Sequence, residues 1–124
     1  MKIAILAWGS LVWDRRTLTV SGEACEGGPK LPIEFLRVSS DGRLTLVIDE
    51  KNGAVVPTRY YVSACTELSQ AIANLQEREG MPKTENVGYV DVISGASSPV
   101  ASAAHPAAVA ALREWATKNG FDAA

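Results

Sequence analysis

A continuous apolar run near the amino terminus constrains the fold of this 124-residue chain most strongly. Residues Ile3 to Trp8 are apolar without a polar break, and Gly9 and Ser10 follow directly. A run of strand length that ends in turn residues is typical of a strand covered on both faces. We therefore expect a central strand here, buried on both sides.

Further strands are predicted in the next part of the chain, after a loop. Residues 17–30 carry glycines and a proline with no helical or strand period, so we expect a long loop of the kind that often carries function. Three strand-like runs then cover residues 33–39, 44–49 and 55–62. Because Asp41-Gly42 and Asn52-Gly53 are strong hairpin signals, these runs predict an antiparallel meander, with Pro57 at an edge or a bulge.

An amphipathic helix is predicted after these strands. We expect Thr66 to cap it, and it runs to Arg78 or Glu79 before it stops at Gly80. Its buried face is predicted to hold Leu68, Ile72 and Leu75. Its solvated face is predicted to hold Glu67, Gln70, Asn74 and Arg78.

The last third of the chain predicts a strand over 87–94 and a second helix that begins near Pro106. Val109, Leu112 and Ala116 have core spacing in this helix, which Asn119-Gly120 ends. The sequence stops where the next strand of a mixed sheet would begin. We therefore expect one domain over residues 1–124 that is truncated at its carboxyl end, or whose sheet is completed by a second copy or another partner.

Composition and charge exclude several classes of function. The formal net charge is −2 and the charges are interspersed, which disfavours nucleic acid and anionic membranes as partners. Cys25 and Cys65 lack Cys-x-x-Cys spacing and are expected to be reduced thiols. His105 precedes Pro106 and is expected to cap a helix or lie exposed, so no zinc site is predicted. With neither a signal peptide nor a membrane span, we expect a cytoplasmic protein.

Glu79 is the first candidate for chemistry. It lies four residues after Leu75 and seven after Ile72, which places a carboxylate on the predicted buried face. It also lies at a helix carboxyl terminus, where the macrodipole disfavours an anion. Both effects would raise its pKa and suit it as a general base near neutral pH. The alternative is a frayed last turn in which Glu79 points to water.

The turn after the first strand is the second candidate. In Trp8-Gly9-Ser10-Leu11, the missing side chain of Gly9 lets consecutive backbone N–H groups point into a concavity that binds a carboxylate or an oxyanion. A plain turn is the alternative interpretation. Ser10 has neither a Gly-x-Ser-x-Gly context nor a histidine partner, so a serine hydrolase triad is not supported.

Together these two features resemble the ChaC-type branch of the γ-glutamylcyclotransferase-like family. The segment Trp8-Gly9-Ser10-Leu11-Val12-Trp13 resembles its Tyr-Gly-Ser-Leu-x-Trp opening. The segment from Leu75 to Gly80, followed by Gly88-Tyr89, is similar to its Leu-Asp-x-x-Glu-Gly and downstream Gly-Tyr. Trp8 stands where the family has tyrosine, and Gln76 stands where it has aspartate.

The resemblance implies an α+β fold, a small mixed-strand barrel with flanking helices. It implies an enzyme of glutathione metabolism that cyclises a γ-glutamyl amide or peptide to 5-oxoproline and releases an amine or amino acid, without a cofactor or metal. Glu79 would be the general base and acid, and Trp8, Gly9, Ser10, Leu11 and Tyr89 would bind the substrate. Two alternatives stay open: a non-catalytic module of the same fold that binds small anions or serves assembly, and an amide hydrolysis or another γ-glutamyl transfer that uses the same carboxylate.

Overall fold

Five strands and two helices make up the part of the chain that the structure describes. The computed structural model describes residues 1–7, 11, 18–38, 44–48, 54–80, 87–99, 102 and 105–124, and it describes the side chains of these except at 32–38, 44–48 and 54. The elements are β1 (Ala4–Ala7), β2 (Lys30–Val38), β3 (Leu44–Ile48), β4 (Ala54–Pro57), β5 (Arg59–Val62), α1 (Leu68–Glu79) and α3 (Pro106–Lys118).

One face of β1 packs against α1. Because side chains alternate along a strand, Ile3, Ile5 and Ala7 share this face. Ile3 belongs to a buried cluster with Ala71 of α1. Ile5 and Ala7 belong to a second cluster, against which Leu75 of α1 packs one turn further along the helix.

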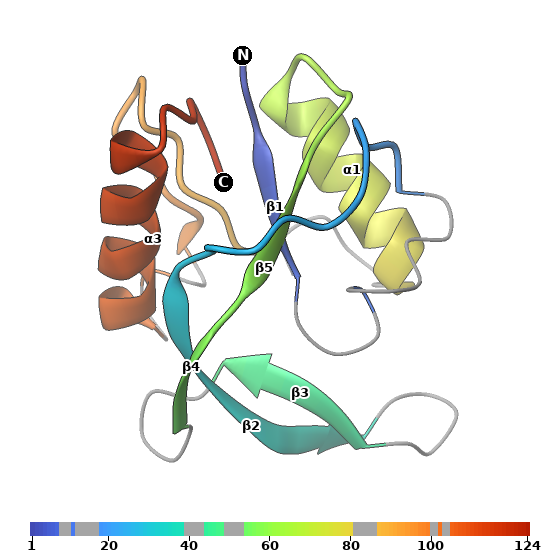
Figure 1. Ribbon diagram of the computed structural model, residues 1–124, viewed down its shortest axis with the longest axis vertical. Helices are drawn as coiled ribbons and strands as arrows, with labels where there is room; N and C mark the ends of the chain where they lie inside the picture. The colour runs from blue at the N-terminus through green and yellow to red at the C-terminus, as the bar shows by residue number, and fades with distance from the viewer. Residues whose placement is uncertain are drawn as a thin grey trace.

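The opposite face of β1 packs against α3. Ala4 lies in a buried cluster with Ala116, and Leu6 packs against the cluster that contains Ala108. Figure 1 shows β1 running between the two helices. The expected strand with two buried faces is therefore confirmed.

The end of the chain supplies a neighbour for β1. On one side β1 pairs antiparallel with β5. On the other side the Ala4 N–H donates to the Ala123 carbonyl at 3.0 Å, and the bridge between Ile3 and Ala123 is parallel. Val90 and Ala124 exchange two backbone hydrogen bonds, of 2.8 and 3.1 Å. The order across this layer is therefore β5, β1, residues 122–124 and residues 90–92.

The strand predicted over residues 87–94 is wrong. Val90 and Asp91 form only isolated bridges, because the chain turns back immediately after them. The Asp91 carboxylate accepts the N–H groups of Ile93 and Ser94 at 3.0 and 3.2 Å, which stabilises this turn.

The long loop predicted over residues 17–30 is only partly correct, because part of this segment runs antiparallel alongside β5. Val20 bridges Ser63, and Cys25 bridges Tyr60, before β2 begins to pair with β4 at Lys30 and Pro57. Between successive pairs, the segment that starts at Val20 advances by five residues, whereas the segment that runs back from Ser63 to Pro57 covers only three. Residues 20–30 therefore contain two β-bulges. A bulge interrupts the alternation of apolar and polar residues, so the sequence of this segment does not show the period of a strand.

A glycine lies in each bulge. Gly22 has a φ of 94° and Gly27 a φ of 87°, which side chains rarely permit. The indole N–H of Trp115 in α3 donates to the Gly27 carbonyl at 2.7 Å and ties the second bulge to the helix.

The predicted meander has the wrong strand order. The second sheet runs β3-β2-β4, so β4 pairs with β2 and not with β3. The turns predicted at Asp41-Gly42 and Asn52-Gly53 lie outside the described residues. Pro57 ends an edge strand, as expected, and the run predicted over 55–62 divides at Thr58 between the two sheets.

The expected closed barrel is also wrong for the described part of the chain, which is a mixed α/β structure with two small antiparallel sheets. In that part, β3 and β4 each pair with β2 alone, so neither continues the second sheet toward β1. Figure 1 shows β2 and β3 lying below the layer that holds β1 and the helices.

The two helices form close to where the sequence predicts them. The first begins one residue later than expected, because Glu67 and not Thr66 is its N-cap, and it ends at Gly80 with φ 66°. The second begins at Pro106 as predicted. Ala116 is buried as expected, whereas Val109 and Leu112 are only half-buried.

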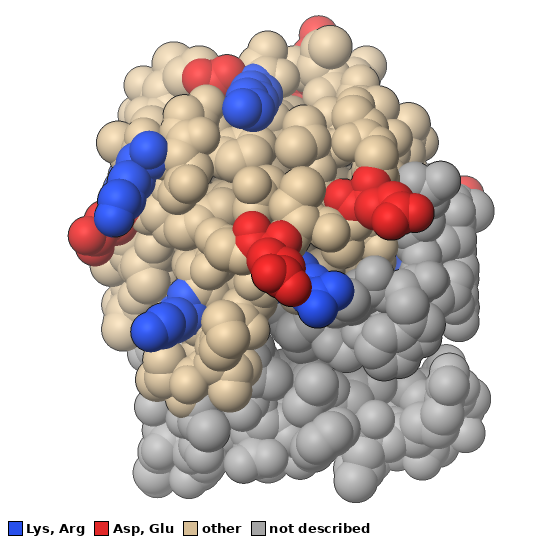
Figure 2. All heavy atoms as spheres, viewed as in Figure 1, with Lys and Arg blue, Asp and Glu red and all other residues tan. Residues whose placement is uncertain are grey.

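Charges of both signs alternate over the face of the molecule shown in Figure 2. The ion pair of Arg59 with Glu26, at 3.6 Å, is exposed, and such pairs contribute little to stability. Neither helix of the described residues has the length and apolar character that crossing a membrane requires.

The packing of β1 against α3 predicts how the protein responds to a larger residue on this helix. Ala116→Leu should lower the free energy of unfolding by about 1–3 kcal/mol, because Ala116 is fully buried against Ala4 and Phe121. Ala110→Leu, on the exposed face of the same helix, should change it by less than about 0.5 kcal/mol. Urea unfolding of both variants measures the difference, and equal costs would contradict the packing described.

Candidate functional site

The carboxyl end of β1 and the carboxyl end of α1 lie at the same end of the molecule (Figure 1). Leu11, which follows this turn, is buried with Ile5 and Ala7, and Leu75 of α1 packs against the same cluster. Glu79 lies four residues beyond Leu75, which is about 6 Å along the helix axis. The cluster therefore places Leu11, the described residue of the first motif, beside the helix whose last residue is Glu79.

A side chain of β5 fixes the far end of the predicted anion-binding turn. The Tyr61 hydroxyl donates to the Leu11 carbonyl at 2.9 Å, and both residues are buried. Trp8, Gly9 and Ser10, the other residues predicted for this turn, lie outside the described residues. Leu11 is thus the described residue of the turn, and it is anchored by packing and by a hydrogen bond.

The chain rejoins the same cluster where it returns from this region. Leu18 is buried beside Leu11, and the Thr19 N–H donates to the side-chain oxygen of Asn74 in α1 at 2.7 Å. The prediction that Asn74 is solvated is therefore wrong. Asn74 is half-buried because the segment after Leu18 crosses its face of the helix.

The buried stripe of α1 differs from the predicted one by a small rotation. Leu68 and Leu75 pack inward as expected, but Ala71 and Arg78 are the buried residues of the helix, where the prediction had Ile72 and Glu79. A stripe over positions 68, 71, 75 and 78 has spacings of three, four and three, which a helix supports equally well.

Glu79 is consequently less buried than predicted, and the expectation that Arg78 is solvated is wrong. The side chain of Glu79 is 31% exposed, whereas that of Arg78 is 4% exposed. A nitrogen of the Arg78 guanidinium lies 3.5 Å from a carboxylate oxygen of Glu79. The candidate base is therefore an accessible carboxylate held beside a buried cation.

Arg78 is the site residue that sequence reasoning missed. An arginine in the last turn of a helix is favoured by the macrodipole wherever it points, so its charge alone gives no sign of burial. The sequence does contain one sign of its burial, because Arg78 lies seven residues after Ala71 and therefore on the same face of the helix. The prediction instead placed the more apolar Ile72 on the buried face.

Among the described residues, no hydrogen bond joins Tyr89 to Glu79 or Leu11. Its backbone exchanges hydrogen bonds with Ser98, whose hydroxyl accepts the Tyr89 N–H at 3.0 Å and whose own N–H donates to the Tyr89 carbonyl at 3.0 Å. The side chain is half-buried. Its predicted role in substrate binding stays a prediction.

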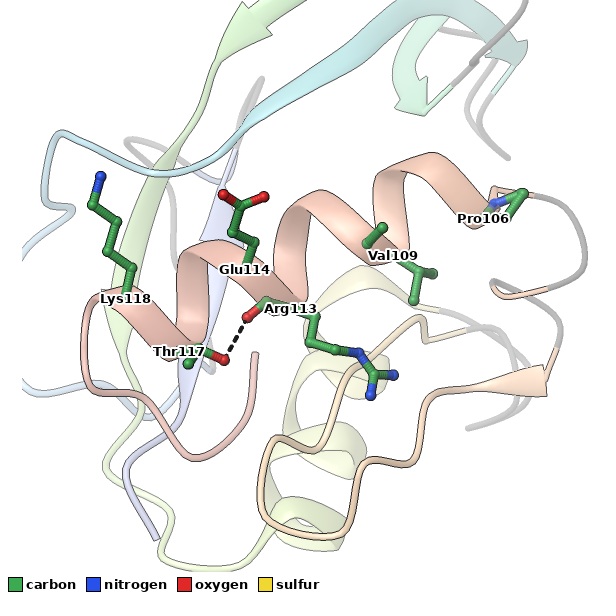
Figure 3. A pocket seen from close by; sticks show the side chains of 7 residues that line it. Pro106, Val109, Arg113, Glu114, Thr117 and Lys118 are labelled. Atoms are coloured by element: carbon green, nitrogen blue, oxygen red, sulfur yellow. Dashed lines mark hydrogen bonds between the residues drawn. The ribbon is translucent and has the colours of Figure 1, made fainter.

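A shallow hollow on α3 lies elsewhere on the surface. All of its lining residues belong to this helix, between Pro106 and Lys118 (Figure 3). The Arg113 guanidinium at its edge donates to the Gly95 carbonyl at 2.7 Å. The hollow is thus the exposed face of a single helix, and it contains none of the predicted site residues.

His105 occupies the N-cap position of α3, as expected, but its side chain forms no capping hydrogen bond. Its Nδ1 atom is buried and has no hydrogen-bond partner in the described part of the chain. Among the described residues, His, Cys, Asp and Glu side chains form no group of three that could hold a metal ion.

Comparisons of the chain with protein-family models, with curated proteins and with solved structures gave no match.

The burial of Arg78 predicts a difference in stability between the two partners of the ion pair. Arg78→Ala should lower the free energy of unfolding by about 2 kcal/mol, because it removes a side chain packed along its whole length. Glu79→Ala should lower it by less than about 1 kcal/mol, since a partly exposed ion pair contributes little. Denaturant unfolding checks both values. An equal loss in the two variants would show that the ion pair, and not the packing of Arg78, dominates.

Proposed function

We propose that this chain is a γ-glutamylcyclotransferase-like enzyme, which cyclises a γ-glutamyl amide or peptide to 5-oxoproline and releases an amine or amino acid. The observation that carries the proposal is the shared cluster of Leu11 and Leu75. It supports a site in which the glycine-containing turn after β1 and the Glu79 carboxylate face one substrate.

The proposed reaction needs little from the protein beyond orientation and proton transfer. The α-amine of the γ-glutamyl group attacks its own γ-carbonyl, so a C–N bond forms within the substrate while the amide C–N bond to the leaving group breaks. Glu79 takes the proton from the attacking amine and returns it to the departing nitrogen. The proton is conserved, and no oxidant or cofactor is required.

The accessible position of Glu79 is compatible with this role. A general base must reach the proton that it removes, and a carboxylate that is 31% exposed can contact a bound substrate directly. A nitrogen of the buried Arg78 guanidinium lies 3.5 Å from one carboxylate oxygen of Glu79, and this ion pair favours the charged carboxylate that a general base requires.

The turn would bind the anionic part of the substrate. Backbone N–H groups at Gly9, Ser10 and Leu11 would cradle the α-carboxylate or the oxyanion that develops on the γ-carbonyl. Trp8 would line the pocket without the hydroxyl that tyrosine has in the family, a change that would alter substrate choice or abolish turnover. Tyr89 would contribute its hydroxyl to the pocket.

Replacement of Glu79 tests the proposal. The wild-type protein should release 5-oxoproline from a member of a panel of γ-glutamyl amino acids, γ-glutamyl amines and glutathione. Glu79→Gln should lower kcat by about 10²–10⁴-fold with little change in KM, because it removes proton transfer but keeps the shape of the side chain. Glu77→Gln, an exposed residue two positions earlier, is the matched control and should keep full activity.

Other outcomes of this assay support the alternatives. Free glutamate as the product, with the same dependence on Glu79, would indicate amide hydrolysis. No product from any substrate, with folded wild-type protein, would overturn the enzymatic proposal in favour of a non-catalytic module that binds small anions.

A further inference from the structure

The two sheets of the described chain share one antiparallel ribbon. One segment of this ribbon covers residues 20–33, and the other runs over residues 54–63 and contains β4 and β5. Figure 1 shows the ribbon passing from the layer of β1 into the sheet below it. The orientation of the second sheet relative to β1 therefore depends on the residues where the ribbon passes from one sheet to the other.

The ribbon passes between the sheets at Thr58, where two residues face one. The Thr58 N–H donates to the Pro29 carbonyl at 3.2 Å, and the Gly28 N–H donates to the Thr58 carbonyl at 3.0 Å. Thr58 thus pairs with both Gly28 and Pro29, which is the arrangement of a β-bulge and bends the strand. Pro29 has no N–H group, so the backbone ladder has one donor fewer at this point.

Two side chains add hydrogen bonds to this bulge. The Thr58 hydroxyl donates to the Pro29 carbonyl at 2.7 Å, and Thr58 is only 3% exposed. The indole N–H of Trp115 in α3 donates to the Gly27 carbonyl at 2.7 Å. The carbonyl groups on both sides of Gly28 are therefore held by side chains, one from the ribbon itself and one from a helix.

The two glycines of the bulge provide the conformational freedom that a hinge requires. Gly27 has a φ of 87°, which other residues rarely adopt. Gly28 lies so close to Thr58 that a Cβ atom would come within 2.6 Å of its carbonyl oxygen and its hydroxyl. Hinges are short sets of residues that absorb changes in φ and ψ, and two consecutive glycines absorb such changes at low steric cost.

We propose that Gly27 and Gly28 form a hinge between the two sheets, and that Thr58 and Trp115 hold this hinge in one conformation. With both side-chain hydrogen bonds in place, β2, β3 and β4 keep one orientation relative to β1 and β5. When either bond is lost, these three strands change orientation as a unit, because they pair with one another beyond the bulge. The hinge does not depend on the proposed function.

The packing beside the hinge limits the size of this change. Leu31 of β2 and Ala108 of α3 form a buried cluster, against which Leu6 and Val56 pack. This cluster joins the near end of the second sheet to β1 and α3. We therefore expect a small rotation of the second sheet about the bulge, and not its detachment.

Residual dipolar couplings of the backbone N–H groups test the hinge, because they report the orientation of each sheet in a common frame. In the wild type, a single alignment tensor should fit β1, β5 and the helices together with β2, β3 and β4. Thr58→Val removes the hydroxyl and keeps the shape of the side chain. In this variant the couplings of β2, β3 and β4 should shrink relative to the others. Its Gly28 amide should exchange about tenfold faster, as expected for one lost hydrogen bond.

Three further variants complete the experiment. Thr58→Ser keeps the hydroxyl and should behave as the wild type. Trp115→Phe removes the indole N–H but keeps a ring that stacks on Phe121, and it should separate the two sheets as Thr58→Val does. Thr117→Val, which removes a hydroxyl that donates to the Arg113 carbonyl within α3, is the matched control and should change neither the couplings nor the exchange.

Several outcomes would overturn the proposal. A wild type that already needs two tensors would show that the hinge is not held in one conformation. A single tensor in Thr58→Val and Trp115→Phe, with Gly28 exchange unchanged, would show that the bulge is no hinge, and a change in only one of them would overturn the role of the other residue. Loss of the whole fold in Thr58→Val, or an equal rise of exchange in β1 and α1, would show that the hydroxyl stabilises the whole protein and not the hinge.

Discussion

The structure depends on the burial of β1 between two helices. Ile3, Ile5 and Ala7 face α1, and Ala4 and Leu6 face α3. Alanines on the strand and on both helices are buried in this packing, among them Ala4, Ala71 and Ala116. The chain end completes the arrangement, because Ala123 is fully buried and its carbonyl accepts the Ala4 N–H. β1 is thus held on both faces and along both edges.

The candidate site lies where the strand leaves this packing. Leu11 and Leu75 share a cluster with the end of β1, so Leu11 and the carboxyl half of α1 are positioned by the same side chains. Two hydrogen bonds add to this packing. The Tyr61 hydroxyl donates to the Leu11 carbonyl, and the Thr19 N–H donates to the side-chain oxygen of Asn74. The proposed chemistry thus requires a rigid support and an accessible carboxylate, and the cluster and Glu79 meet these two needs.

Features that depend on a local pattern could be predicted from the sequence. Features that depend on which strand pairs with which, or on which residue of a helix faces the core, could not. The apolar run of β1 and the helix stop at Gly80 are local, and both are confirmed. Asn52-Gly53 favours a turn but does not select the neighbour of the next strand, and β4 pairs with β2. Likewise, Arg78 and Glu79 are adjacent in a helix whose period of 3.6 residues allows either to face inward, and in the structure Arg78 is the buried one.

Backbone NMR of a substrate complex tests the location of the site most directly. Uniformly ¹⁵N-labelled Glu79→Gln protein, which should bind substrate without consuming it, would be titrated with L-γ-glutamyl-L-alanine. The account predicts saturable shifts of the amide signals of Gly9, Ser10 and Leu11 together with those of Arg78 to Gly80, while the signals of α3 stay unchanged. Saturable shifts confined to α3, or none near residues 9–11 and 78–80, would contradict a shared site at the end of β1.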